Sequence, residues 1–237
     1  MKIVVNHLTR MQQGYFCVAR IDLDSLRHVR PVIARQQMSV GLLARYDGPF
    51  DMARIIELGP VRHVPDGPHV EDHQFDPTAA RAGETYDGAE FWQLLRTVAR
   101  PQLGDLFGRH LKRVGAHSCA VSLGQGETSL GCLLTRSCPR LYVQPRTGKS
   151  DQIRMRLCDS ALDVDLPVTD IRLYGDDHVT PNLPLVERCA RRLREARPLV
   201  VSMGLTRPSQ SSRGCEPLHC LQVNNLHFAD APTWQLG

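Results

Sequence analysis

The sequence has no Cys-x-x-Cys pair, no long apolar run and very few lysines. Its eight cysteines lack the paired spacing of a zinc ribbon, so we expect them to be reduced and free of metal. No apolar run reaches the roughly 18–20 residues that cross a membrane, so no membrane partner is expected. The opening residues, MKIVVNHLTRM, hold too few apolar side chains for a signal segment, which favours a cytoplasmic location.

Familiar catalytic motifs are absent as well. There is no G-x-S-x-G motif, and the stretch TGKS (147–150) lacks the earlier glycine of a phosphate-binding loop. Asp170, Asp176 and Asp177 follow one another in VTDIRLYGDD, and grouped acids hold magnesium in some nucleases. We expect instead that Asp170 orders a neighbouring arginine or turn and that the other two cap a bend. No catalytic residue and no cofactor are therefore predicted.

Arginine supplies almost all of the positive charge. The chain has 26 arginines and 3 lysines, and a GC-rich genome would give this bias by itself. Arginine nevertheless brings planar, forked donors that suit phosphates and base edges. The net charge of +4 falls entirely in residues 101–237, which hold 17 basic and 13 acidic residues, whereas residues 1–100 hold 12 of each.

Short β-prone runs separated by turn residues occupy most of the chain. Helices are expected over 87–100 and 182–197, where apolar residues recur on one face and a proline follows. Residues 64–77 are expected to form a polar, turn-rich loop. Strands are expected over 2–5, 15–23, 27–34, 52–61, 117–123, 130–136, 140–145, 152–159, 168–174, 198–207 and 218–228.

Many short strands with few aromatic residues favour small closed or partly closed β-barrels. Two barrels of roughly 100 residues each would fit the length of 237 residues. We therefore predict a mostly β protein with two barrels and two accessory helices. The predicted boundaries are 1–100 for the first barrel and its helix, 101–116 for a linker, and 117–237 for the second barrel with an inserted basic helix.

A Leu-Thr-Arg triplet ends three of the apolar runs, at residues 8–10, 134–136 and 205–207. The triplets would mark equivalent strands of repeated barrels, with an arginine at each strand end. Two interpretations remain open for these arginines. Each could contact a ligand, or each could pair with a nearby carboxylate such as Asp170 or Glu71.

Several motifs, in their order and spacing, resemble the bacterial dual OB-containing domain family (DuOB). They are HLTRM, FCVARID, VRPV, FDMARIIELGPV, PHVEDH, LPVTDIRLY, VSMGLTRP and LQVNNLHF, and together they span His7 to Phe228. The resemblance implies two OB folds and nucleic-acid binding in prokaryotic antiviral defence. Arg20, in FCVARID, stands where the resemblance implies a small residue.

The strongest local signal is a basic stretch over residues 136–156, which holds six cations and one acid, Asp151. A basic groove with an aromatic ring suits single-stranded nucleic acid, because charge follows the phosphates and rings stack on bases. The hairpin QPRTGKSDQ would be a contact loop between two barrel strands. Secondary contacts are expected from two of the triplet arginines, Arg10 and Arg207. The predicted nucleic-acid-binding residues are Arg136, Arg140, Tyr142, Arg146, Lys149, Arg154, Arg156, Arg10 and Arg207.

These observations predict non-enzymatic binding of RNA or single-stranded DNA, with a protein effector as a possible second partner. One alternative is a protein-interaction or small-ligand sensor module coupled to a separate effector. A weaker alternative is a metal-dependent nuclease that uses the carboxylates. No metal site is predicted, although two clusters hold ligand-type side chains, PHVEDH (68–73) and CEPLHC (215–220).

Overall fold

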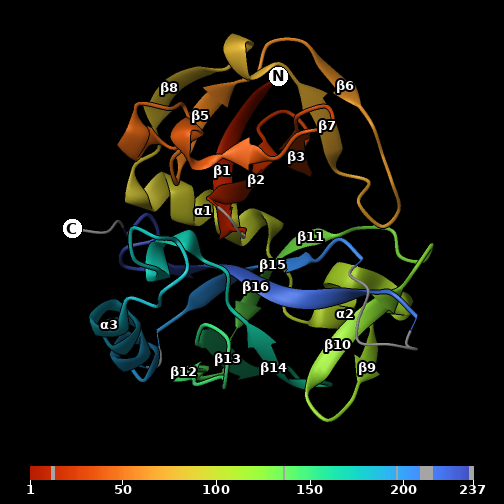
Figure 1. Ribbon diagram of the computed structural model, residues 1–237, viewed down its shortest axis with the longest axis vertical. Helices are drawn as coiled ribbons and strands as arrows, with labels where there is room; N and C mark the ends of the chain where they lie inside the picture. The colour runs from red at the N-terminus through yellow and green to blue at the C-terminus, as the bar shows by residue number, and fades with distance from the viewer. Residues whose placement is uncertain (12–13, 136, 196, 209–215, 235–237) are drawn as a thin grey trace.

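The computed structural model describes residues 1–11, 14–135, 137–195, 197–208 and 216–234. The described chain forms two halves that lie one above the other, residues 1–100 at the top of Figure 1 and residues 101–234 below. We call these the N-terminal half and the C-terminal half. One cluster of buried apolar side chains lies within the C-terminal half, and a second is centred on the N-terminal half and also contains Cys132, Ile171 and Val200. The predicted mostly β fold is confirmed.

The N-terminal half is built on one eight-stranded sheet with β1 (Lys2–Arg10) between β2 and β5. The apolar run Ile3–Val5 is fully buried there, because β1 is covered on both faces. The strand order is β6–β7–β3–β2–β1–β5–β8, with β4 paired to β2. The other strands are β2 (Tyr15–Asp22), β3 (His28–Val32), β4 (Met38–Ser39), β5 (Arg54–Glu57), β6 (Val61–His63), β7 (Asp72–Phe75) and β8 (Arg81–Thr85).

The C-terminal half contains two smaller sheets. Strand β13 alternates buried apolar and outward polar side chains, as the pattern IRMRL predicts. One sheet has the order β11–β15–β16–β10–β9 and the other the order β12–β13–β14. Their strands are β9 (Lys112–Val114), β10 (Ser118–Ser122), β11 (Leu130–Thr135), β12 (Arg140–Gln144), β13 (Gln152–Cys158), β14 (Asp163–Pro167), β15 (Leu199–Leu205) and β16 (Leu218–Phe228).

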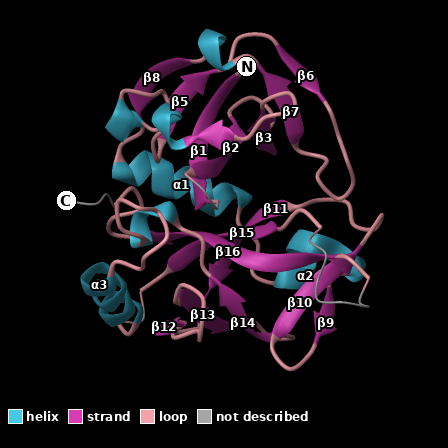
Figure 2. Cartoon of the chain, viewed as in Figure 1, coloured by secondary structure: helices cyan, strands magenta, loops and turns pink. Residues whose placement is uncertain are grey.

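Three α-helices occur in the described chain, one more than predicted. Both expected helices are present, as α1 (Gly88–Val98) and α3 (Leu183–Leu193), and each begins at a side-chain N-cap. The additional helix α2 (Leu103–Phe107) lies in the segment predicted as a linker, and it buries Leu103 and Phe107 in the C-terminal core. The domain boundaries themselves stay a prediction. Figure 2 shows α2 and α3 on opposite flanks of the C-terminal strands.

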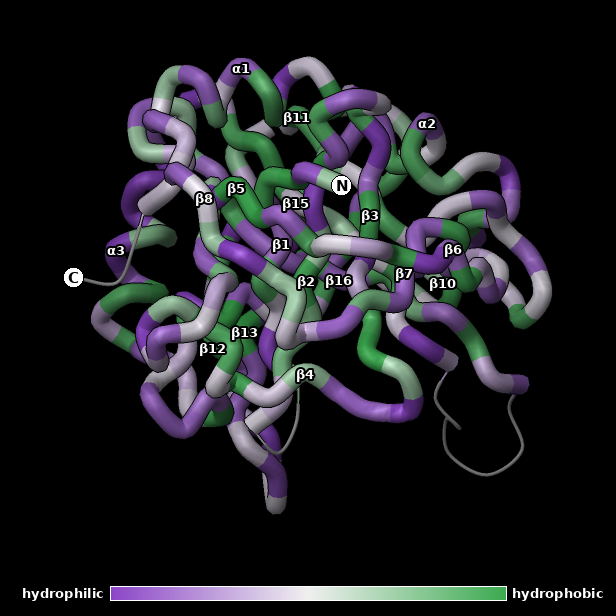
Figure 3. The backbone as a smooth tube through the Cα atoms, turned by 90° about the horizontal axis from the view of Figure 1, so that it is seen from above, coloured by the Kyte–Doolittle hydropathy of each residue, from purple (hydrophilic) through white to green (hydrophobic). Residues whose placement is uncertain are grey.

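Two local predictions are wrong. Residues 168–174 do not form a strand, because the Asp170 side chain caps a 3-10 turn, η5 (Ile171–Leu173), and pairs with Arg172. The loop expected over 64–77 contains β7, which runs parallel to β3, a partner some 40 residues earlier in the chain. Hydrophobic stretches gather along the central strands in Figure 3, and hydrophilic stretches lie mainly in outer loops. No helix in the described ranges is both long and apolar enough for a membrane crossing.

Strands β1 and β16 bring the two halves together. The Asn225 amide donates to the Leu8 carbonyl at 3.1 Å and accepts from the Leu8 amide at 2.7 Å, so this side chain takes the place of a neighbouring strand. Ser202 donates to the Asn6 carbonyl at 2.9 Å. Because these polar groups are buried and paired, they fix the position of β1 against the C-terminal half.

Candidate nucleic-acid interface

The outer face of the β12–β13–β14 sheet carries most of the predicted contact residues. In this sheet Tyr142 lies opposite Arg154, and Arg140 lies opposite Arg156. Inward positions such as Ile153 and Met155 are fully buried, so the alternating outward positions share one surface. We call this surface, with the hairpin that joins β12 to β13, the basic sheet face. Its members are Arg140, Tyr142, Arg146, Lys149, Arg154 and Arg156.

Two acids of β14, Asp163 and Asp165, also lie on this face, and both are outside the basic stretch 136–156. Arg154 pairs with Asp165 at 3.1 Å, and Arg156 pairs with Asp163 through two bonds of 3.1 and 2.6 Å. The Asp163 carboxylate raises the pKa of Arg156, and Arg156 in turn lowers the pKa of Asp163. A phosphate would therefore have to compete with a carboxylate for these two arginines.

The remaining cations of the face are less engaged. Among the described residues, none of Arg140, Arg146 and Lys149 forms an ion pair with an acid. The Arg140 guanidinium lies 5.6 Å from the centre of the Tyr142 ring. The Arg146 side chain bonds the Ser150 carbonyl at 2.8 Å within its own hairpin. Cations without an acidic partner therefore lie at both ends of the face, Arg140 at the start of β12 and Arg146 and Lys149 on the hairpin, where they are available to an anionic chain.

Tyr142 is held in a defined orientation. Its hydroxyl donates to Asp165 at 2.5 Å, and burial followed by this hydrogen bond raises its pKa. The ring stays half-buried beside Arg140 and Arg154. A ring fixed in this way loses little conformational freedom when a base stacks on it.

Arg10 and Arg207 lie apart from the basic sheet face but close to each other in space. They line one pocket of about 590 Å³ between the halves, together with apolar side chains of β2, β3 and β15. Arg10 donates to the His178 carbonyl at 3.1 Å and stacks on Tyr174. Arg207 pairs with Asp72 and more loosely with Asp66, at 3.8 Å. We call this cavity the inter-half pocket. Arg136, the third triplet arginine, lies outside the described residues.

The motif PHVEDH joins the two halves. Glu71 accepts hydrogen bonds from the backbone amides of Ser129 and Leu130, at 2.8 and 3.2 Å, and from the hydroxyls of Thr128 and Ser129. The next residue, Asp72, pairs with Arg30 at 3.0 Å and with Arg207. We call this set of bonds the Glu71 clamp. Sequence reasoning missed it, although the paired acids between two histidines were the visible signal.

The three acids considered for a nuclease, Asp170, Asp176 and Asp177, each have a different partner. Asp170 is fully buried against Arg172, at 2.7 Å, which confirms the expected arginine partner. Hydrogen bonds from Thr180 and Val179 lower the pKa of Asp177 to about 2, and Asp176 lies 3.3 Å from Arg45. Within the described part of the chain these carboxylates form no metal-binding group.

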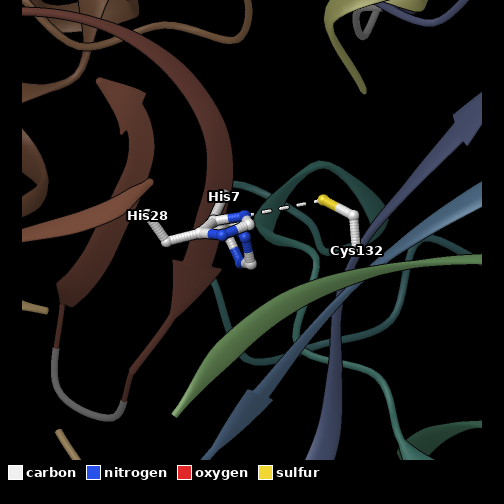
Figure 4. Close-up of side chains that lie close together, drawn as sticks. All are labelled: His7, His28 and Cys132. Atoms are coloured by element: carbon white, nitrogen blue, oxygen red, sulfur yellow. Dashed lines mark hydrogen bonds between the residues drawn. The ribbon is translucent and has the colours of Figure 1, made fainter. Parts of the chain in front are cut away.

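A different group contains metal-ligand side chains. His7, His28 and Cys132 come from β1, β3 and β11, and their ligand atoms all lie within 4.8 Å of one another. Figure 4 shows the imidazoles of His7 and His28 close together, edge to face, with the Cys132 thiol facing them. This was not predicted, because the three residues are far apart in the sequence. The two clusters considered from sequence, PHVEDH and CEPLHC, meet at one point, where His69 Nε2 lies 3.3 Å from His219 Nδ1. Cys215 of the second cluster is outside the described residues.

Comparison with known proteins gives one match to a family model. The model described as "Dual OB-containing domain" matches residues 1–205. No curated protein matches the chain. Among solved structures, a murine DNA-binding protein bound to double-stranded DNA aligns over 96% of both chains, at 10% identity and a TM-score of 0.30. A TM-score this low carries no argument about fold or ligand.

Proposed function

The chain belongs to the dual OB-containing domain family, and on that basis we propose that it binds RNA or single-stranded DNA without being an enzyme. OB folds commonly bind oligonucleotides through a sheet face and its adjoining loops. The basic sheet face has this form, because it combines a fixed tyrosine ring with free cations on the neighbouring hairpin. That combination is the observation that carries the proposal.

The ion pairs change which residues should contribute most. Arg154 and Arg156 would bind a phosphate only by exchanging Asp165 and Asp163, so part of the gain would be cancelled. Arg140, Arg146 and Lys149 have no such competitor among the described acids. We propose that these three, with stacking on Tyr142, supply most of the affinity. Arg10 and Arg207 would be secondary contacts in the inter-half pocket.

A salt-titrated binding assay tests the proposal, with labelled single-stranded DNA, RNA and duplex DNA as probes. The variant pair Arg140→Gln with Lys149→Gln should weaken binding and flatten the log–log salt slope by about 1.4, since each phosphate contact to a single strand contributes about 0.7. Arg191→Gln with Arg194→Gln, at exposed positions of the α3 region, is the matched control and should have a smaller effect. Absence of binding by the unchanged protein at low salt would overturn the proposal.

Tyrosine variants separate stacking from charge. Tyr142→Ala should cost about 1–3 kcal/mol of binding free energy if a base stacks on the ring. Tyr142→Phe keeps the ring and removes only the hydrogen bond to Asp165, so it should retain most of the affinity. If the two variants bind equally well, Tyr142 does not stack on a base.

The inter-half pocket favours one alternative, a small-ligand sensor coupled to a separate effector. A cavity of about 590 Å³ with a mostly apolar lining and a few convergent polar groups is typical of small-ligand sites. Binding of a small anionic ligand that depends on Arg10 and is insensitive to the Arg140→Gln/Lys149→Gln change would support this alternative.

We keep three expectations as part of the proposal, a place in prokaryotic antiviral defence, a protein effector and a cytoplasmic location. They follow from the family resemblance and the sequence.

A further inference from the structure

We propose that His7, His28 and Cys132 bind one divalent transition-metal ion of the zinc class, with the Asn6 side chain as the fourth ligand. This proposal is independent of nucleic-acid binding. It concerns the contact between the halves, because β1 and β3 belong to the N-terminal half and β11 to the C-terminal half. The two imidazoles and the thiol meet where β1 faces the C-terminal sheet (Figure 4).

The separations of the side-chain atoms suit a tetrahedral ion. With zinc–sulfur and zinc–nitrogen bonds of about 2.3 and 2.05 Å, two ligand atoms in a tetrahedron lie about 3.6 Å apart. The distance from His28 Nε2 to Cys132 Sγ is 3.6 Å. The Asn6 amide nitrogen lies 3.3 Å from His28 Nε2 and 3.4 Å from Cys132 Sγ. Only the His28–Cys132 distance joins two ligand atoms, and it matches the edge of a tetrahedron, while the Asn6 nitrogen occupies the place that its amide oxygen would take.

Two buried polar atoms at this place have no hydrogen-bond partner in the described structure. They are His7 Nε2 and Asn6 Oδ1, on side chains that are 1% and 0% exposed. A buried polar atom without a partner costs about 1–3 kcal/mol, so each of these two atoms needs an explanation. Rotation of the Asn6 amide by half a turn would turn Oδ1 toward His28 and Cys132. A metal ion would then satisfy both atoms.

The other ring nitrogen of His7 is held in place by its surroundings. As placed, the Asn224 amide nitrogen donates to His7 Nδ1 at 3.0 Å and the Asn224 oxygen accepts from Gln222 at 2.9 Å, so the ring proton lies on Nε2. A metal-bound histidine donates from its second nitrogen instead, so metal binding requires the Asn224 and Gln222 amides to turn by half a turn, after which Asn224 Oδ1 accepts from His7 Nδ1–H. The Nε2 atom is therefore the one left to bind an ion.

Binding requires both imidazoles in the neutral form and the thiol without its proton. Cys132 would lose its proton to water when the metal–sulfur bond forms. The bound ion and thiolate together carry one positive charge, which the Glu71 carboxylate near His28 favours and the Arg30 guanidinium opposes.

A pocket borders the site on each side. His28 lines a cavity of about 880 Å³ that also contains Glu71 and Gly131, and His7 lines the inter-half pocket. An ion bound here would connect three strands from two sheets. We infer that it serves a structural role, since all four positions of the tetrahedron would be occupied by protein side chains.

Metal analysis of the purified full-length chain is the first test. The protein should hold about one equivalent of zinc when prepared without chelators. After chelation, added Co²⁺ should give a thiolate-to-cobalt charge-transfer absorption. Cys132→Ser should abolish that absorption and weaken Co²⁺ binding by at least about 100-fold, more than the loss of an outer partner would.

Two controls distinguish this site from casual binding. Cys119→Ser removes an equally buried cysteine that belongs to no metal-binding group in the described residues, and it should bind Co²⁺ normally. His63→Asn breaks a stacked pair of imidazoles, the exposed His63 and the half-buried His73, and it should also bind normally. The proposal is overturned if the unchanged protein binds neither ion stoichiometrically. It is equally overturned if a folded Cys132→Ser protein binds as tightly as the unchanged one.

Discussion

Removal of the Glu71 side chain should destabilise the protein more than any other single glutamate change. Glu71 is 6% exposed, and its carboxylate accepts two backbone amide hydrogens and two hydroxyl hydrogens from residues 128–130. In Glu71→Ala, Thr128 retains the Leu130 carbonyl as an acceptor at 3.1 Å. The amides of Ser129 and Leu130 would keep no partner from the clamp.

Two orphaned backbone amides cost about 2–6 kcal/mol together, at about 1–3 kcal/mol each. The adjoining cavity of about 880 Å³ is lined by Glu71, Thr128 and Leu130, so water could reach part of the exposed site. We therefore expect the lower part of the range, about 2–4 kcal/mol. In a chain of this size that loss lowers the melting temperature by about 4–16 °C, at about 2–4 °C per kcal/mol.

Chemical denaturation followed by tryptophan fluorescence measures the effect, since Trp92 lies in the N-terminal half and Trp234 in the C-terminal half. Glu71→Gln keeps one acceptor oxygen and should cost about 1–2 kcal/mol, because neutral hydrogen bonds are weaker than charged ones. Glu57→Ala, at an exposed position of β5, is the control and should change stability by less than about 0.5 kcal/mol. If Glu71→Ala unfolds like Glu57→Ala, the clamp does not stabilise the contact between the halves.

Two further predictions concern buried charge. Arg20 is fully buried, its guanidinium has no hydrogen-bond partner in the described structure, and it lies 4.2 Å from the centre of the Phe50 ring. Arg20→Met should therefore raise the free energy of unfolding by about 1–2 kcal/mol, after the lost cation–π contact is subtracted. A lower free energy of unfolding in this variant would show that the charge is stabilised in the fold. Burial, and then the charges of Arg30 and Arg207, lower the pKa of His69 to about 2. Since the unfolded chain binds this proton near pH 6.5, stability should fall by about 1.4 kcal/mol per unit as the pH drops below that value. When the free energy of unfolding is measured from pH 7 to 5, its slope against pH should be shallower in His69→Gln than in the unchanged protein. An unchanged slope would show that His69 does not contribute to the pH dependence.

The sequence predicted those elements whose signal is local. Helices α1 and α3 have apolar faces and capping residues within their own segments, and β13 alternates within seven residues. The pairing of β7 with β3 could not be predicted in this way, since a parallel partner lies far away in the chain. The strand expected over 168–174 failed because a buried ion pair between Asp170 and Arg172 outweighed the β-prone pattern.

The same limit applies to charge. A count along residues 136–156 gives five net positive charges, but the register of the sheet places Asp163 and Asp165 beside two of the arginines. Acids that neutralise a basic stretch can come from the next strand, which a window on the sequence does not include. The free cations on the hairpin are therefore a better guide to a binding surface than the total charge.

The repeated Leu-Thr-Arg triplets show how one local sequence meets different surroundings. Arg10 rests on the Tyr174 ring and bonds a carbonyl, whereas Arg207 pairs with two carboxylates, yet both line the inter-half pocket. The two interpretations of these arginines are therefore compatible. Arg207 is exposed, and its loose bond to Asp66 can be exchanged for a ligand anion while Asp72 keeps its bond to Arg30. Arg10 pairs with no carboxylate among its described contacts. An anion in the pocket could therefore bind Arg10 without breaking an ion pair, which costs less free energy than binding Arg207 would.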